Sequence, residues 1–139
     1  MSFIDNITKF SGDFNELTYS VGNLRYDKLS KFYFSLFKYE KDEEKKSILH
    51  LAYDQMQDIW NICKDKDNSK HPTEVVGFNG SIDELAKLIT ELSLSYSARF
   101  YFSLSENILN QSKNDKEIRH PILSKKLYNN FETLKQIYS

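Results

Sequence analysis

The five residues Phe32-Tyr33-Phe34-Ser35-Leu36 are repeated letter for letter as Phe100-Tyr101-Phe102-Ser103-Leu104. The similarity continues toward the N-terminus without a gap, to Phe14 in the first copy and Ile82 in the second, through positions alike in polarity and size. A repeat of this kind dictates architecture, because each copy is a structural unit that packs against its neighbour. The repeat therefore predicts one helical unit used twice.

The similarity resumes after a change of length, where Ala52–Met56 matches Leu127–Phe131. Both stretches carry apolar residues at helical spacing. We therefore expect an all-α, compact bundle of about six helices, built from two tandem, sequence-similar units. The expected organisation is a single domain over 1–139, with unit 1 at about 3–65, a loop at 66–80 and unit 2 at about 81–139.

Composition excludes several classes of protein. Of the 139 residues, 40% are hydrophobic and 28% charged, which suits one globular domain and neither a disordered nor a membrane-embedded chain. The 19 Lys and Arg residues are balanced by 20 Asp and Glu, so the chain as a whole lacks the positive charge that favours nucleic acid. Neither a signal peptide nor a membrane-spanning apolar run is present, and we expect a cytoplasmic protein.

Apolar spacing predicts three helices in the first unit. Apolar residues recur every three or four positions from Phe3 to Leu24, with a possible kink at Ser11-Gly12 and an end at Gly22-Asn23. A second helix is expected over Tyr26–Tyr39. The charged stretch Glu40–Lys46 is interpreted as a turn and the first turn of a third helix, whose apolar face ends at Cys63, a thiol expected to be buried and inert.

Three further helices are expected in the second unit. Ser81 and Glu84 have the spacing of a capping box, in which each side chain binds the other residue's backbone amide at a helix start. A helix should follow from there. The polar run Asn110–Asp115 is interpreted as a break, and Pro121 as the first turn of the last helix.

One passage favours a different structure. From Leu92 to Ser105 apolar residues alternate with polar ones, which is typical of a β-strand. The matching first copy lacks this alternation, and no turn or partner strand accompanies the passage. We expect a helix here, and a strand or hairpin remains the alternative.

The three histidines are the natural candidates for metal or acid–base chemistry. Glu117 and His120 have the spacing found in di-iron bundles, and His50 with Asp54 is one helical turn apart. Metal sites need several convergent ligands, however, and no second copy of the Glu-x-x-His pattern exists. We therefore expect no catalytic residues, no metal and no cofactor.

Opposite charges occupy matched places in the two units. Glu16 and Lys31 in unit 1 correspond to Glu84 and Arg99 in unit 2. One hypothesis is that each pair ties together the first two helices of its unit. Independent, solvated charges are the alternative.

Tyrosine-rich helical proteins without catalytic motifs suit protein binding, because aromatic residues anchor interfaces. The sequence analysis therefore predicts a non-catalytic, protein-binding protein, most simply a small inhibitor of the immunity or antitoxin type that occludes a partner, such as a toxin. The alternatives are a helical subunit of a nucleic-acid-binding complex that uses residues 113–139, and a metal-dependent bundle enzyme that uses His50, His71 and His120.

The loop at 70–80 is the first candidate for partner binding. Val76 and Phe78 form an apolar tip between glycines and polar residues, which is typical of a contact site. The alternative is that both side chains fold back and plug the end of the bundle. The residues expected to bind a partner are Val76, Phe78, His71, Tyr39, Lys125 and Lys126.

Overall fold

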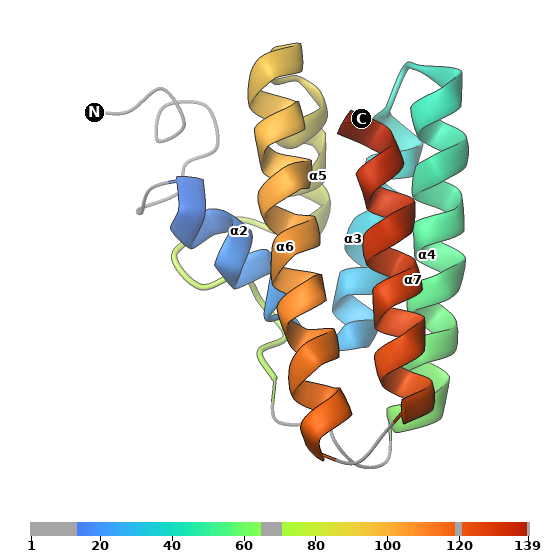
Figure 1. The fold of residues 1–139 in the computed structure, drawn as a ribbon. Coiled ribbons are helices and arrows are strands. Elements are labelled where there is room, and N and C mark those ends of the chain that lie inside the picture. Colours follow the sequence, from blue (N-terminus) through green and yellow to red (C-terminus); the bar gives the residue numbers. More distant parts are fainter. Residues whose placement is uncertain (1–13, 65–70, 119–120, 139) are drawn as a thin grey trace.

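The computed structural model describes residues 14–64, 71–118 and 121–138. These residues form an all-α bundle of six helices (Figure 1). The stretch before Phe14, with its expected kink at Ser11-Gly12, lies outside the described residues. The helices are α2 (Phe14–Gly22), α3 (Tyr26–Tyr39), α4 (Glu43–Cys63), α5 (Ile82–Thr90), α6 (Leu94–Ile118) and α7 (Pro121–Tyr138).

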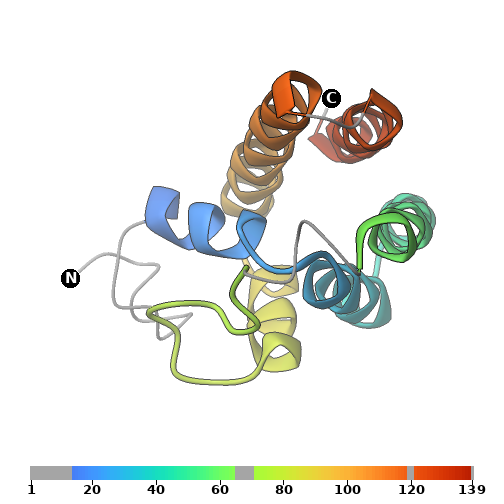
Figure 2. The same ribbon diagram turned by 90° about the horizontal axis from the view of Figure 1, so that it is seen from below.

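Two antiparallel hairpins, α3–α4 and α6–α7, form the long part of the bundle and meet through α4 and α7 (Figures 1 and 2). The two shorter helices cover the opposite side. Viewed along the bundle, α2 lies crosswise on this side, next to α6 (Figure 2). It packs on α6, whereas α5 packs on α3. Each short helix therefore lies on the hairpin of the other half of the chain.

Helix boundaries keep the register of the repeated sequence. α2 and α5 are nine residues long each, and their first residues, Phe14 and Ile82, are matched in the repeat. α3 and α6 begin at Tyr26 and Leu94, which are matched by the same offset. The two copies thus have the same secondary structure over their similar stretches.

The core is centred on the repeated aromatic residues. Phe32 and Phe100 are fully buried, and their ring centroids lie 6.0 Å apart. Tyr33 and Tyr101 follow them into the interior. Tilted rings at such a separation attract each other through their quadrupoles, beyond the hydrophobic gain of burial. Matched residues of the two copies therefore meet at the centre of the bundle.

A polar centre lies within this core. The Tyr33 hydroxyl donates to Asn130 Oδ1 at 3.1 Å, and Asn130 Nδ2 donates to Ala52 O at 3.2 Å and to Gln55 Oε1 at 2.9 Å. The buried Tyr101 hydroxyl has no partner among the described residues. Burial raises the pKa of both tyrosines, because a phenolate there would lose its hydration.

Local chemistry explains where the helices start. Asp42 caps α4 by accepting from Glu44 N at 3.0 Å. Ser81 Oγ accepts from Glu84 N at 3.1 Å, while Ser81 N donates to Glu84 Oε1 at 3.2 Å. The predicted capping box is confirmed. These bonds satisfy backbone amides that have no partner inside a helix.

The expected break at Asn110–Asp115 is wrong, because α6 continues to Ile118. The run contains no glycine or proline, and its polar residues can face outward without ending the helix. Gln111 also ties α6 to the rest of the fold: its Nε2 donates to Gly22 O, and its Oε1 accepts from the Tyr26 hydroxyl at 2.9 Å. The strand alternative for Leu92–Ser105 is also wrong, because α6 covers this passage from Leu94 onward.

Two simpler expectations can be compared directly with the structure. Cys63 is 2% exposed, as expected for an inert thiol at the end of α4. Within the described ranges, every helix is too short or too polar to cross a bilayer.

Candidate functional site

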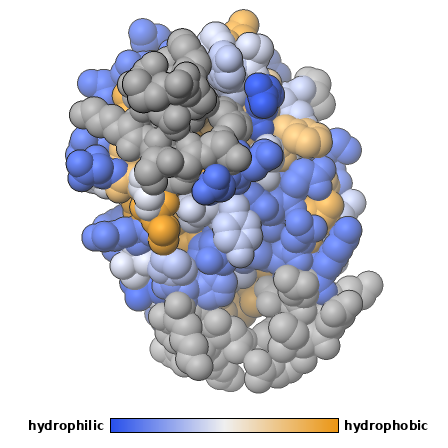
Figure 3. Space-filling model, turned by 90° about the vertical axis from the view of Figure 1, so that its left-hand side faces the viewer, coloured by the Kyte–Doolittle hydropathy of each residue, from blue (hydrophilic) through white to orange (hydrophobic). Residues whose placement is uncertain are grey.

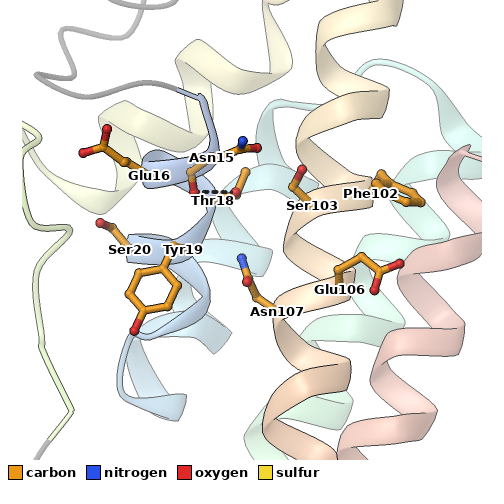
Figure 4. Close-up of a pocket in the computed structure, with 9 residues that line it drawn as sticks. All are labelled: Asn15, Glu16, Thr18, Tyr19, Ser20, Phe102, Ser103, Glu106 and Asn107. Carbon is orange, nitrogen blue, oxygen red and sulfur yellow. Dashed lines mark hydrogen bonds between the residues drawn. The ribbon is translucent and has the colours of Figure 1, made fainter.

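A cleft of about 570 Å³ separates α2 from α6. At one end the helices nearly touch, because a Cβ on Gly22 would lie 2.9 Å from Asn107 Cβ. Glycine is therefore required where the backbones approach. Away from this point the helices diverge and the cleft opens. It is lined by Asn15, Glu16, Thr18, Tyr19, Ser20, Phe102, Ser103, Glu106 and Asn107 (Figure 4).

The cleft has a neutral polar floor between the two helices, formed by Asn15, Thr18, Ser103 and Asn107 (Figure 4). Thr18 Oγ1 donates to the Asn15 carbonyl at 3.0 Å, so this hydroxyl is held on α2. The side-chain amides of the two asparagines each offer donors and an acceptor to an occupant.

Each rim of the cleft combines a carboxylate with an aromatic ring. Glu16 and Tyr19 lie on the α2 side, and Glu106 and Phe102 on the α6 side (Figure 4). Tyr19 is 63% exposed and Phe102 50%. Within the described part of the chain, the Glu106 carboxylate has no hydrogen bond or ion pair. Carboxylates beside exposed ring faces suit a positively charged group on an apolar stem.

The surroundings of the cleft are polar. The side of the molecule on which α2 lies is largely hydrophilic outside the grey residues, with small separated hydrophobic patches (Figure 3). Beyond Phe102 and Ser103, the surface continues into a smaller hollow of about 340 Å³ that Arg99 lines. The surface thus changes from acidic at Glu106 to basic at Arg99.

A matched groove of about 490 Å³ lies between α3 and α5. There Asp83 Oδ1 accepts from Ser35 Oγ and from Lys38 Nζ, both at 2.9 Å, and Asp83 Oδ2 accepts from the Tyr39 hydroxyl at 2.5 Å. Lys38 and Tyr39 stabilise the carboxylate and lower the pKa of Asp83 to about 2. Three side chains of α3 are therefore held on one carboxylate of α5.

This ion pair should make stability depend on acid. Because the pKa of Asp83 is lower in the folded protein, its contribution is fully present above the ordinary value of 3.8 and disappears as the pH falls through about 2. Lys38 and Asp83 side chains are 50% and 43% exposed, so solvent screening limits the contribution to about 1 kcal/mol or less. Asp83→Asn should be less stable than the wild type at pH 7 by this amount, and urea unfolding should show the difference shrinking between about pH 4 and pH 2. An equal difference at pH 7 and pH 2 would contradict the assignment.

Of four matched positions in the two grooves, three differ and one, the serine, is the same. Asn15 takes the place of Asp83, Ser103 of Ser35, Glu106 of Lys38 and Asn107 of Tyr39. Hydrogen bonds join α3 to α5 at these positions. Among the described residues, no hydrogen bond joins the Asn15 side chain to the three residues of α6. The charge reversal from Lys38 to Glu106 leaves the α2–α6 cleft open and acidic.

The residues that the sequence proposed for partner binding do not form one surface with this cleft. Tyr39 is bound to Asp83. His71 lies half-buried between elements, with Nδ1 3.0 Å from Asn23 O and its ring stacked on Tyr26. Both residues thus have structural contacts, and neither lines the cleft.

The loop tip divides into an exposed part and a packed part. Val76 is 67% exposed, whereas Phe78 is partly buried against the core and Val75 is buried. Gly77, with φ 90°, makes the turn that separates them, and Phe78 N donates to Val75 O at 3.2 Å. The plug alternative thus describes Phe78, and the contact alternative remains open for Val76.

The proposed cationic and paired residues lie elsewhere. Lys125 is exposed, and Lys126 forms an ion pair with Asp58 of α4. Glu84 accepts from Ser81 N within the capping box, and Lys31 lines the α3–α5 groove.

The charge-pair hypothesis assumed that the first two helices of each unit pack together. α2 packs mainly on α6 and α5 mainly on α3. The Glu16–Lys31 and Glu84–Arg99 pairs within each unit stay predictions, which these helix contacts do not test.

No cluster of three or more His, Cys, Asp or Glu residues suited to a metal ion occurs among the described residues. His50 Nδ1 lies 3.3 Å from Asp54 Oδ2 on the outside of α4, and its ring packs against Phe37 and Tyr53. This is the exposed histidine–acid pair that the sequence favours over a metal site. The side chains of Glu117 and His120 lie outside the described residues.

Comparison of the chain with protein-family models, curated proteins and solved structures found no match. The basis for proposing a function is thus a pair of grooves at matched positions, of which one is crossed by hydrogen bonds between its helices and the other, among the described residues, is not. The sequence analysis missed the open cleft, although the change from Lys38 to Glu106 is visible when the repeats are aligned.

Proposed function

We propose that this chain is a non-catalytic, protein-binding protein and that the α2–α6 cleft is its contact site. The observation that supports this best is the pairing of an exposed ring with a carboxylate on each rim, at Tyr19 with Glu16 and at Phe102 with Glu106. Exposed aromatic anchors beside a hollow are where interface energy concentrates. The cleft volume also falls in the range of about 300–1,000 Å³ that binding sites occupy.

Within this class we propose a small cytoplasmic inhibitor of the immunity or antitoxin type, which occludes a partner protein such as a toxin. A helical scaffold that holds its contact residues in place before binding supports such a role, because pre-organisation lowers the entropy lost on association. The single cysteine, buried at the end of α4, supports a reducing compartment.

We also infer that the bundle consists of two tandem, sequence-similar units. The matched starts of α2 and α5, and of α3 and α6, support this inference. So does the contact between the matched rings of Phe32 and Phe100. An approximate two-fold relation between the units would explain why α2 packs on α6 while α5 packs on α3.

The test is capture of the partner by matched variants. Immobilised wild type, Phe102→Ser and Phe34→Ser should be exposed to lysate from the source cells, and a protein retained in one-to-one ratio should be purified and titrated by calorimetry. Phe34 and Phe102 are matched in the repeat and are 41% and 50% exposed, so their substitution removes similar surface. Phe102→Ser should weaken binding at least about tenfold, since anchor residues contribute 2 kcal/mol or more. Phe34→Ser should bind like the wild type.

Circular dichroism of both variants would verify that the fold is retained. Equal binding by the two variants would place the contact elsewhere on the protein. Retention of nucleic acid in place of a protein would favour the alternative in which residues 113–139 contact a nucleoprotein complex.

A further inference from the structure

We propose that the α2–α6 cleft binds an arginine side chain presented by the partner protein. This inference rests on the proposed function and deepens it, because it states which chemical group the cleft recognises. Three features support it: the carboxylate of Glu106, the exposed rings of Tyr19 and Phe102, and the neutral hydrogen-bonding floor between them (Figure 4).

The matched contact between α3 and α5 already includes a cationic side chain of the protein itself. Lys38 Nζ lies 2.9 Å from Asp83 Oδ1 and 4.9 Å from the centroid of the Tyr39 ring, so the ammonium has both a carboxylate and a ring beside it. An ammonium in such a place gains from the carboxylate and from the negative face of the ring. The contact between α3 and α5 is therefore supplied with a cation by the protein itself.

The α2–α6 cleft keeps the groove but lacks this cation. Glu106 stands where Lys38 would be, and the acceptor Asp83 is replaced by the neutral Asn15. The carboxylate thus lies on the long helix rather than on the short one, and no cation takes the place of Lys38. A cation supplied from outside would restore the arrangement that the other groove contains.

The hydrogen-bonding floor favours arginine over lysine. A guanidinium has five N–H donors in one plane and is weakly hydrated, so it can contact a carboxylate, amide oxygens and ring faces together. Glu106, Asn15, Ser103 and Asn107 offer acceptors from both helices. An ammonium has three donors and holds its water more strongly, so it would use fewer of them. Arg99 lines the neighbouring hollow, where its positive charge would disfavour binding of a cation.

The test uses the full chain and small probes. N-acetyl-arginine amide should be titrated into the ¹⁵N-labelled protein, with N-acetyl-citrulline amide as the neutral probe of the same shape and N-acetyl-lysine amide as the ammonium probe. We expect saturable shifts at the amides of Asn15, Ser103 and Asn107 with a dissociation constant of about 1–10 mM, which is the affinity one side chain can give. The citrulline probe should give none at the same concentration, and the lysine probe should bind at least about threefold more weakly.

A matched pair of variants isolates the carboxylate. Glu106→Gln keeps the size of the side chain and should weaken arginine binding at least about fivefold. Glu44→Gln removes one charge from an exposed carboxylate of α4, outside the cleft, and should leave it unchanged. Shifts that are equal with citrulline, equal with lysine, absent up to 50 mM, or insensitive to Glu106→Gln would each overturn the arginine assignment.

The two proposals can fail separately. If the captured partner depends on Phe102 but not on Glu106, protein binding stands and the arginine assignment falls. If the arginine probe binds at the cleft while the partner ignores both residues, the cleft recognises guanidinium but is not the contact site for that partner, and the proposed function falls.

Discussion

Replacing Phe32 or Phe100 by alanine is expected to lower the free energy of unfolding by about 3–5 kcal/mol in each case. Both side chains are fully buried, and each ring lies against the other at the centre of the bundle. Truncation removes apolar surface from the core and leaves a cavity that helices from both halves cannot close. Urea unfolding followed by circular dichroism measures the loss.

Because the two rings touch, their losses should not add. The double variant should deviate from the sum of the single variants by about 0.5–3 kcal/mol. The matched controls are Phe34→Ala and Phe102→Ala, whose partly exposed rings should cost less than half as much. Losses below about 1 kcal/mol for Phe32→Ala and Phe100→Ala would show that these rings are not the centre of the core.

Asn130→Ala is expected to cost about 3 kcal/mol, because one deletion removes three hydrogen bonds, two of them between buried groups. The Tyr33 hydroxyl would lose its acceptor, and Ala52 O and Gln55 Oε1 would lose their donor. Thermal and urea unfolding of the purified variant measure the effect. The cost of unpaired buried polar groups exceeds what the same bonds contribute between exposed groups.

The two buried tyrosines give an internal comparison. Tyr33→Phe should cost about 1–3 kcal/mol, since it leaves Asn130 Oδ1 unpaired. Tyr101→Phe removes a hydroxyl that has no partner among the residues the structure describes, and it should be neutral or stabilising. A loss for Tyr101→Phe as large as for Tyr33→Phe would mean that this hydroxyl is satisfied, for example by a buried water.

Much of the fold follows from local rules in the sequence. The capping box at Ser81 and the glycine at the end of α2 are chemistry of neighbouring residues, and both occur where expected. Comparison of the repeats also resolved the alternating stretch after Leu92 correctly as helix. The capping box depends on residues within one helical turn, whereas the alternating stretch was assigned from a similar sequence 68 residues away.

Long-range packing was harder to predict. The extension of α6 through Asn110–Asp115 is supported by Gln111, whose partners, Gly22 and Tyr26, lie near the other end of the chain. Likewise, Tyr39 was predicted to bind a partner protein, whereas its hydroxyl donates to Asp83 of α5, which is distant in sequence. The predicted helix break and the predicted exposed tyrosine failed because the tertiary partners of these residues cannot be identified from sequence spacing.

The position of the candidate cleft could not be predicted from local sequence patterns either, although alignment of the repeats indicates some of its residues. That α2 packs on α6 is a tertiary fact, so no local pattern indicates a site between them. Alignment of the repeats nevertheless reveals that Glu106 replaces Lys38 and Asn107 replaces Tyr39. Positions at which two similar stretches of sequence differ in charge are therefore candidates for a site.

The packing of each short helix on the distant hairpin also constrains how the protein forms during synthesis. When α2, α3 and α4 have been made, the surface on which α2 packs does not yet exist, since α6 follows much later in the chain. The apolar residues of α2 that are buried in the folded protein, such as Leu17 and Val21, therefore stay exposed until the second half of the chain has been synthesised. Contacts between residues so far apart in sequence slow folding, because the long loop must close first. We therefore expect the nascent first half to be the stage at which exposed apolar surface makes this protein most prone to aggregation.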